Sequence, residues 1–433
     1  MLDLDIEWLE APAVANAELR ETWARLSVRV EDATPCALLD DASGSVRTSL
    51  YLPLYPLAEW FAYHWWTIFY ESYSTSRDSR AGYHFRHSFI GAAEGFLLPD
   101  LAFYPMGDFM QLLWHPRSVE HASIRFLNEG LACLDKAEVM RRVTAFIDSV
   151  VNRLEARNIY DSALQLEWAA VRGLSVEERR FCQTSAQLGI DPFNAPDGLD
   201  HELTKLQETL APSAFQELLS AVPSESLARA AQTIQRFRGK HPLDLKALRH
   251  SLSRVGKADW KQPWEVGYRF AEELRGNLKL RDEPLADEAA LAHALGAGGQ
   301  PLYSGLSAQA RPNFSAITRS LNQGEAFFGV ASSLAANRRF AFCRALFPFL
   351  IKDSGKNDVH LVTSGHTPMQ QAGRAFAAEF LAPRNVVSEK LGNLKDDYDC
   401  FDEVAKTYGV SSLVIENQNR NARRLGAVPV FAY

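Results

Sequence analysis

The sequence predicts an α+β protein of two or three domains, and three observations lead to this fold class. A chain of 433 residues is longer than one ordinary hydrophobic core. Segments near the N-terminus alternate apolar and polar residues with the period of two that is typical of strands. Residues 136–238 instead carry the 3.6-residue periodicity of helices, and two further short strands precede a strongly apolar helix at 339–350.

Residues 1–120 are expected to form a mixed α/β domain with an aromatic-rich core, and this domain is a candidate sensor. An amphipathic helix is expected from about Leu57 to Glu71, where apolar residues recur at helical spacing. Strands are expected at 26–30, 48–52, 89–99, 101–104 and 109–114, with a turn at Met106, Gly107 and Asp108.

Residues 121–258 are expected to be a helical middle region, and residues 262–433 a C-terminal domain. The stretch 256–263 is the expected boundary between the two. Helices are predicted at 139–154, 161–170, 212–219, 227–237, 264–278 and 287–295, and strands at 315–319 and 326–330.

Composition narrows the function classes. The five cysteines are scattered without a Cys-x-x-Cys pair, which disfavours a disulfide framework and a zinc ribbon. The acidic N-terminus differs from a signal peptide, and no apolar run reaches the roughly 20 residues of a membrane span. The expected location is therefore the cytoplasm, with no membrane contact. A net charge of −7 gives no general attraction to nucleic acid, and no glycine motif indicates a cofactor.

The apolar helix at 339–350 has the frame of a zinc-peptidase helix without its chemistry. In an H-E-x-x-H helix two imidazoles hold zinc, and the glutamate activates the metal-bound water. The corresponding residues here are Arg344, Ala345 and Pro348. A guanidinium has no lone pair to donate, alanine offers no base, and proline offers no ligand. Pro348 is also expected to kink or end the helix. No catalytic or metal-binding role is predicted for these residues.

The sequence around this helix resembles the ImmA/IrrE family of bacterial metallopeptidases over about residues 262–426. The frame of the family's pattern Arg-x-x-Phe-Thr-Leu-Ala-His-Glu-Leu-Gly-His is retained in Phe340–Cys343, Leu346, Phe349 and Leu350. A second block, Phe376–Pro383, keeps the family's Phe-Ala-x-x-x-Leu-x-Pro spacing, and Tyr408–Glu416 resembles its closing helical pair. The family's third metal ligand, a glutamate, falls at about Gln370.

This resemblance implies a degenerate zincin-like fold for the C-terminal domain and the function of a catalytically inactive relative. Members of the family are associated with stress responses, phage repressors and mobile genetic elements, often with a helix-turn-helix partner. The implied function is therefore binding of a protein or ligand in a bacterial stress, phage-defence or mobile-element response. The implied partner is a protein such as a helix-turn-helix repressor or a defence component.

One alternative is a zinc metallopeptidase that cleaves a repressor-type partner with ligands outside the family pattern. Candidate ligands in the N-terminal domain are His84, His87, Glu94 and His115. His84 and His87 are expected in a loop that leads into a strand, where a structural role is favoured. His360 and His366, between the two family-like blocks, have two interpretations: a place near the vestigial site, or a strand and a turn beside the domain. The second interpretation is favoured.

A second alternative is a DNA-binding transcriptional regulator. Residues 401–415 fit the spacing of a helix-turn-helix, with Gly409 at the turn. Phosphate contacts would come from Arg420, Arg423 and Arg424, whereas Glu416 would repel phosphate. Nucleic acid is therefore a less favoured partner than protein.

Arg344 itself has two interpretations, because a charge on an apolar face is costly without a partner. It can pair with a buried carboxylate and close the former site, or it can face an acidic group of a ligand. The first interpretation is favoured, and the sequence does not name the carboxylate.

Overall fold

The computed structural model describes residues 1–74, 79–92, 95–252, 259–306, 313–352, 358–392 and 398–423. The protein is mixed α/β, with several small sheets whose strands are almost all antiparallel. It divides into two compact units, Met1–Asp200 and His201–Tyr433. The boundary falls within residues 121–258, so the helices of that stretch are shared between the units.

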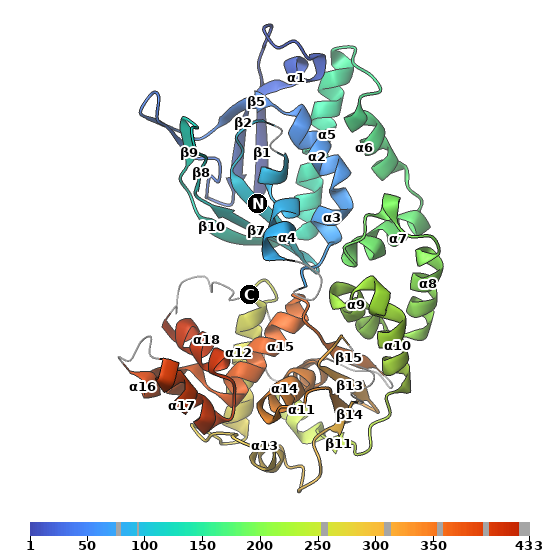
Figure 1. Ribbon diagram of the computed structural model, residues 1–433, viewed down its shortest axis with the longest axis vertical. Helices are drawn as coiled ribbons and strands as arrows, with labels where there is room; N and C mark the ends of the chain where they lie inside the picture. Colours follow the sequence, from blue (N-terminus) through green and yellow to red (C-terminus); the bar gives the residue numbers. More distant parts are fainter. Residues whose placement is uncertain are drawn as a thin grey trace. The chain divides into compact units, whose positions relative to one another are not determined.

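The first unit places helices against three small sheets (Figure 1). Its strands are β1 (Leu2–Trp8), β2 (Trp23–Val30), β3 (Leu38–Asp40), β4 (Ser45–Arg47), β5 (Leu50–Pro53), β6 (Asp100–Met106), β7 (Phe109–His115), β8 (Arg117–Ser118), β9 (Ile124–Phe126) and β10 (Gly130–Asp135). Its helices are α1 (Ala17–Glu21), α2 (Tyr55–Tyr63), α3 (Trp65–Tyr70), α4 (Arg80–His87), α5 (Lys136–Ala156), α6 (Ala163–Gly173) and α7 (Val176–Gln187), with 3₁₀ turns at Phe89–Ala92 and Pro192–Asn194.

Helix α5 shows why the periodicity predicted helices correctly in this unit. The Asp135 carboxylate caps its N-terminus by accepting a hydrogen bond from the Glu138 amide at 2.9 Å. Its buried residues recur every three or four positions, so one stripe packs against β1, β7 and β10. The stripe consists of Val139, Val143, Phe146, Ile147, Val150 and Leu154.

Three local predictions for this unit are wrong. The single helix expected at Leu57–Glu71 is two helices, because the backbone at His64 leaves the helical region and its ring Nδ1 lies 3.0 Å from the Trp60 carbonyl. His84 and His87 lie on α4 and not in a loop, since Ser79 caps that helix. No strand forms in the described part of 89–99, where Phe89 packs as a buried ring against Phe103 at 5.4 Å between centroids.

The second unit has one principal sheet with helices packed on it. Its strands are β11 (Leu243–Asp244), β12 (Ser304–Gly305), β13 (Ala316–Ser320), β14 (Glu325–Val330) and β15 (Val359–Val362). Neighbours run in the order β11-β14-β13-β15, all antiparallel, and β12 pairs with β14 in parallel. The register places Thr318 opposite both Phe328 and His360.

Eleven helices of the described residues accompany this sheet, and the last of them form a C-terminal helical group. They are α8 (Leu199–Thr209), which begins at the unit boundary, α9 (Pro212–Ala221), α10 (Leu227–Arg236), α11 (Lys246–Leu252), α12 (Pro263–Asn277), α13 (Glu288–Ala294), α14 (Ala335–Ile351), α15 (Pro368–Leu381), α16 (Arg384–Leu391), α17 (Tyr398–Tyr408) and α18 (Ser412–Arg423), with a 3₁₀ turn at Ser224–Ser226. Helix α14 packs on β13, β14 and β15, and α9 packs beside β15.

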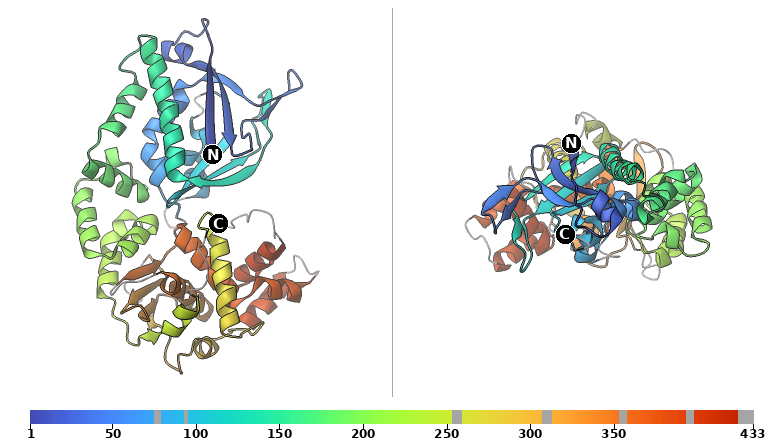
Figure 2. Two further views of the ribbon diagram at one scale, coloured as in Figure 1. Left: turned by 180° about the vertical axis from the view of Figure 1, so that it is seen from behind. Right: turned by 90° about the horizontal axis from the view of Figure 1, so that it is seen from above.

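Helix α12 packs along α15, and the two helices lie side by side in the left view of Figure 2 (yellow and orange). Small residues permit it: a Cβ atom on Gly267 would lie 2.2 Å from the carbonyl oxygen of Ala372 and 2.9 Å from Cβ of Ala375. The backbones of the two helices therefore touch between Ala372 and Phe376, in the middle of α15.

Of the two predicted effects of Pro348, a kink or an end of the helix, the end does not occur, because α14 continues to Ile351. Pro348 cannot donate to the carbonyl of Arg344, so one helical hydrogen bond is missing. The helix persists because Phe347, Phe349 and Leu350 are buried in the core of the unit. The Lys352 amide then donates to the Pro348 carbonyl at 3.1 Å and closes the last turn.

Candidate functional site

The fold brings Arg344 and Gln370 into direct contact. Arg344 lies in the second half of α14, and Gln370 lies in the first turn of α15. Arg344 Nη2 donates to Gln370 Oε1 at 2.7 Å and to the carbonyl oxygen of Thr363 at 2.8 Å. Ala345 and Pro348 are buried on the same helix. Two of the three positions that the resemblance assigns to metal ligands, Arg344 and Gln370, are thus joined by a hydrogen bond within the protein.

The Gln370 side-chain amide uses its full hydrogen-bonding capacity. Its oxygen also accepts from the Thr363 amide at 3.1 Å. Its nitrogen donates to Glu217 Oε2 at 2.9 Å and to the Leu361 carbonyl at 2.7 Å. The amide nitrogen thus donates two hydrogen bonds and the amide oxygen accepts two, which is all that a primary amide can make. Through these bonds Gln370 joins Arg344 to Glu217.

Glu217, on α9, is the buried carboxylate that sequence reasoning did not identify. Its Oε1 accepts from the Thr367 hydroxyl at 3.0 Å. It lies on a helix whose neighbouring residues Phe215, Leu218 and Leu219 are buried. The only hint of this buried carboxylate in the sequence was an acidic residue within an apolar segment. Arg344 does have a buried carboxylate nearby, but the two charges are linked through Gln370 and not by a direct ion pair.

Burial dominates the electrostatics of this network, which we call the Arg344–Gln370–Glu217 network. Burial raises the pKa of Glu217, although hydrogen bonds from Gln370 and Thr367 oppose the shift. Burial also lowers the pKa of Arg344 well below its usual value, and the Arg374 guanidinium acts in the same direction while Glu217 opposes it. Burial thus destabilises the charged form of both the Glu217 and the Arg344 side chain.

The donors at this place do not fit zinc. A guanidinium, a methyl group, a proline ring and a fully hydrogen-bonded amide supply neither imidazole nor thiolate nor an available carboxylate. Across the described ranges, no group of three or more His, Cys, Asp or Glu residues is arranged to hold a metal ion.

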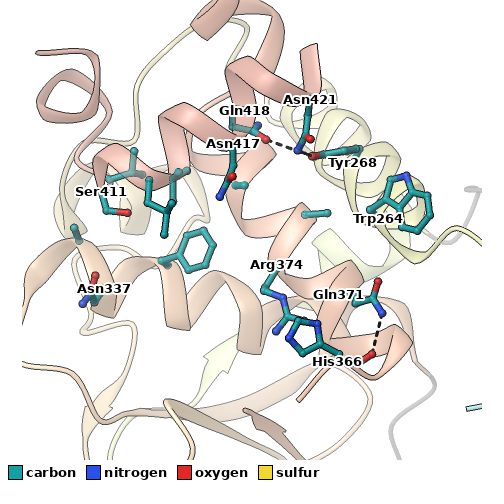
Figure 3. A pocket seen from close by; sticks show the side chains of 17 residues that line it. Trp264, Tyr268, Asn337, His366, Gln371, Arg374, Ser411, Asn417, Gln418 and Asn421 are labelled. Atoms are coloured by element: carbon teal, nitrogen blue, oxygen red, sulfur yellow. Dashed lines mark hydrogen bonds between the residues drawn. The ribbon is translucent and has the colours of Figure 1, made fainter. Parts of the chain in front are cut away.

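A pocket of about 350 Å³ opens beside the network (Figure 3). Its walls come from α12, α14, α15 and α18, with His366 preceding α15. On α14 the lining residues Asn337 and Phe340 continue along the same stripe to Arg344, and Gln371 follows Gln370 on α15. The full lining consists of Trp264, Tyr268, Ala336, Asn337, Phe340, His366, Gln371, Arg374, Ala375, Ala378, Val410, Ser411, Leu413, Val414, Asn417, Gln418 and Asn421.

Arg374 and His366 form one side of the pocket. Arg374 Nη1 donates to the Gly365 carbonyl at 3.1 Å, and its Nη2 lies 3.4 Å from His366 Nδ1. Burial and the charges of Arg374 and Arg344 lower the pKa of His366 to about 3. The imidazole is therefore neutral at physiological pH. Because Nδ1 faces a cationic donor, we assign the ring proton to Nε2.

The opposite wall is fixed by buried hydrogen bonds. Gln418 donates to Glu379 Oε2 and to the Ala382 carbonyl, both at 2.8 Å. Asn421 donates to the Tyr268 hydroxyl at 2.6 Å, as Figure 3 shows. Burial, together with the charge of Glu379, raises the pKa of Tyr268 to about 12. The pocket is thus lined by side chains that are already held in place.

His84 and His87 of the first unit each contact a different carboxylate. His87 Nε2 lies 3.0 Å from Glu71 Oε2 and its Nδ1 lies 2.9 Å from the Phe103 carbonyl. His84 Nε2 lies 2.7 Å from Asp100 Oδ1. Both nitrogens of His87 face protein oxygen atoms, so neither presents a lone pair to a metal.

The remaining histidine candidates do not complete a ligand set. His115 is exposed at the end of β7, and Glu94 lies outside the described residues. His360 is buried on β15 with Nε2 3.3 Å from Asp358 Oδ2, as the predicted strand placed it. His366 precedes α15 and lines the pocket.

The C-terminal residues form the two helices that were predicted, α17 and α18, with Gly409 at a φ of +62° between them. Arg339 of α14 donates to the Gly409 carbonyl and so fixes this turn to the sheet-packed helix. Arg420 is bound to Glu416 at 2.6 Å. The Arg423 side chain and Arg424 lie outside the described part of the chain. One face of α18 lines the pocket.

No family model matches the chain, and neither a curated protein nor a solved structure shows significant similarity to it. The ImmA/IrrE resemblance therefore stays a prediction from the sequence. Over the described ranges, no helix is both long enough and apolar enough to cross a membrane.

Proposed function

We propose that the second unit is a degenerate ImmA/IrrE-like domain that binds a protein or ligand and cleaves nothing. One observation carries this proposal: the positions expected to hold a metal are closed by the Arg344–Gln370–Glu217 network, while a pocket lies open beside them. Residues that would bind and activate water are thus replaced by residues that stabilise the fold, and a binding surface remains.

The biological setting comes from the resemblance alone. It is a bacterial stress, phage-defence or mobile-element response, with a helix-turn-helix repressor or a defence component as the partner. In this proposal residues 1–120 act as the sensor and the pocket of the second unit engages the partner.

The test is titration calorimetry of the full chain against the products of the genes adjacent to its own. We expect one product to bind and to remain uncleaved by mass spectrometry. Asn417→Trp, which fills the pocket from α18, should weaken that binding, whereas Arg420→Gln on the same helix should not. Cleavage of the bound partner, or binding that ignores the filled pocket, would contradict the proposal.

The peptidase alternative makes a different prediction for purified protein. Stoichiometric zinc that survives dialysis, measured by elemental analysis, would favour it. The DNA-binding alternative predicts salt-dependent binding to duplex DNA that is lost on substitution of Arg420, Arg423 and Arg424 together. The Arg420–Glu416 pair argues against it, because the carboxylate neutralises that guanidinium.

A further inference from the structure

The second unit carries a net positive charge although the whole chain is acidic. Residues 1–200 contain 29 Asp and Glu against 17 Lys and Arg, whereas residues 201–433 contain 24 against 29. From Leu227 to Leu243 the chain has no Asp or Glu and four cations, which are Arg229, Arg236, Arg238 and Lys240. Glu225 and Asp244 border this stretch. Such a concentration of one sign of charge is typical of a surface that meets an anionic partner.

On helix α10 two of these cations share the exposed stripe. The buried stripe of the helix consists of Leu227, Ala230, Ala231 and Ile234. Arg229 and Arg236 are seven residues apart, so they lie two turns apart on the opposite side, and both are exposed. Gln232 lies between them and is also exposed. The stripe thus offers two guanidinium groups and one amide, with no carboxylate.

The segment after α10 keeps the other two cations on the surface. Phe237 is buried, and Gly239 lies so close to the sheet that a Cβ atom there would be 2.3 Å from Cβ of Phe327 on β14. Arg238 and Lys240 alternate with these two residues and are exposed. Contact with β14 on one side of the segment therefore leaves the two cations facing solvent on the other.

This basic surface is separate from the pocket. None of its four cations lines the pocket. Figures 1 and 2 show α10 on the other side of the sheet from α16, α17 and α18. A partner bound through this surface would therefore not occupy the pocket.

The positive charge of the surface is not neutralised within the described part of the protein. The side chains of Arg229, Arg236 and Lys240 make no hydrogen bond and no ion pair with any described residue. Arg238 donates from Nη1 to two backbone carbonyl oxygens, at 2.6 and 3.0 Å, and these carry no net charge. All four side chains thus keep their charge, and three of them keep all their donors.

A fifth cation lies next to this surface. Arg319 of β13 donates from Nη2 to the Ile234 carbonyl at 2.8 Å, at the C-terminal end of α10. Burial, followed by the charge of Arg238, lowers the pKa of Arg319. The two guanidinium groups therefore repel each other, and an anion at the surface would offset that repulsion.

The surroundings of these cations favour phosphate groups over an acidic protein. Protein interfaces are built around apolar and aromatic anchors. Among the described residues between 201 and 330, no large apolar side chain is exposed. Without an exposed aromatic ring the surface cannot stack on bases, as proteins that bind single strands do. The guanidinium, ammonium and amide donors that remain are those that contact the phosphates of a duplex.

We propose that the surface formed by Arg229, Arg236, Arg238 and Lys240 binds the phosphate backbone of double-stranded nucleic acid without reading its sequence. This inference depends neither on the pocket nor on the ImmA/IrrE resemblance. DNA and RNA duplexes present the same phosphate groups, and the experiment includes both.

Fluorescence anisotropy of labelled duplexes of about 20 base pairs, titrated with the full chain, measures the binding at 50 and 200 mM salt. Four phosphate contacts predict a slope of about −3.6 for log affinity against log salt, and hence a loss of roughly 100-fold over this range. We expect DNA duplexes of unrelated sequence to bind equally. An RNA duplex of the same length shows whether the surface distinguishes the two backbones.

A triple variant locates the binding. Arg229→Gln, Arg236→Gln and Lys240→Gln together remove side chains that contact no described residue, so the fold should persist. This variant should lose at least about tenfold in affinity at 50 mM salt, and its salt slope should become shallower by about 3. The salt slope of the unaltered chain tests the proposal even without a variant.

A second triple variant is the matched control. Arg420→Gln, Arg423→Gln and Arg424→Gln together remove the same net charge near the C-terminal end of the chain. This control should bind the duplex as the unaltered chain does. Equal losses in both triple variants would mean that net charge alone determines binding, and would overturn the assigned surface.

Other results would also contradict the proposal. Absence of binding at 50 mM salt, or binding that does not weaken with salt, would exclude phosphate contacts by this surface. Tighter binding of polyglutamate than of the duplex would assign the surface to an acidic protein, and tighter binding of a single strand would exclude the duplex. These results leave the proposed function of the pocket untouched, because Asn417→Trp tests that function separately.

Discussion

At the scale of single residues, Gln370 links the two buried ionisable side chains of the second unit, Arg344 and Glu217. Its amide oxygen faces a cation and its amide nitrogen faces a carboxylate, so one neutral side chain satisfies both. A glutamate at this position would supply a metal ligand but no donor for Glu217 or for the Leu361 carbonyl. The choice of amide over acid therefore favours a closed, folded site over a metal site.

Gln370→Ala should destabilise the second unit by about 2–3 kcal/mol, because it leaves two buried charged groups and two backbone groups without their partner. Thermal melting of the full chain will measure the change. Gln300→Ala, at an exposed position of the same unit, is the control and should leave melting unaltered. A Gln370→Ala variant as stable as the control would show that the network contributes nothing to folding.

Glu217 should make stability fall as pH rises. Its pKa is raised above the ordinary value of 4.5 by burial, so the folded protein holds a proton that the unfolded chain has released. The contribution of Glu217 to the free energy of unfolding is complete below pH 4.5. It is lost as the pH rises through the pKa that Glu217 has in the folded protein. Glu217→Gln keeps the shape without the titration. Its stability relative to the unaltered chain should therefore increase above pH 4.5 and then level off in urea denaturation; a constant difference would refute this.

Glu71 of the first unit should behave in the opposite way. Burial alone would raise its pKa, but hydrogen bonds and charges from His87 and Arg86 outweigh burial and lower it from 4.5 to about 2. The stabilisation is present above pH 4.5 and is lost as the pH falls towards 2. Its size is about 3 kcal/mol at neutral pH.

Glu71→Gln should therefore cost about that much at neutral pH and progressively less in acid, as measured by urea denaturation at several pH values. Glu120→Gln, at an exposed loop position, should cost nothing at any pH. A cost for Glu71→Gln that does not vary with pH would point to lost packing in place of lost charge pairing.

Some residues of the site could be predicted from the sequence and some could not. The resemblance assigned Arg344 and Gln370 to one vestigial site, and in the fold Arg344 Nη2 lies 2.7 Å from Gln370 Oε1. Glu217 was missed because it lies 153 residues before Gln370, and a glutamate in an amphipathic helix looks like a surface residue. Only tertiary packing turns it towards the network.

At the scale of elements, periodicity identified most helices because each buries one stripe of side chains. It failed where one side chain changes the backbone, as at His64 between α2 and α3, or where a cap creates a short helix, as Ser79 does for α4. It also failed at Phe89, because a run of apolar residues indicates burial without specifying a strand.

The contact of α12 with α15 gives a prediction for two glycines of one helix. Alanine favours helix formation over glycine by about 1 kcal/mol. At Gly276 a Cβ atom would meet nothing within 4 Å, so Gly276→Ala should stabilise the protein slightly. At Gly267 it would meet the α15 backbone at 2.2 Å, so Gly267→Ala should destabilise by about 2 kcal/mol or more in spite of propensity. Thermal melting that ranks the two variants the other way would contradict this packing.

At the scale of the whole molecule, the two units have separate hydrophobic cores. One core contains buried residues from Leu2 to Ala186, and the other contains residues from Leu243 to Ile415. Length alone predicted more than one core, but the expected boundary at 256–263, which lies partly outside the described residues, is not where the two units divide. They divide at Asp200, where helices continue on both sides and leave no signal in the sequence.

Differential scanning calorimetry of the full chain should therefore show two transitions. We expect Glu71→Gln to lower one transition and Gly267→Ala to lower the other, because each substitution affects one core. A single transition lowered by both substitutions would mean that the units unfold cooperatively.

The Arg344–Gln370–Glu217 network also bears on how this chain can evolve. A histidine introduced at residue 344 would remove the donor that reaches Gln370 and the Thr363 carbonyl, and a glutamate at 370 would remove the amide donor that reaches Glu217 and the Leu361 carbonyl. Each step taken alone would weaken the fold before any catalytic benefit appeared. Under the proposed function, we therefore expect a zinc site to arise here only through several simultaneous changes.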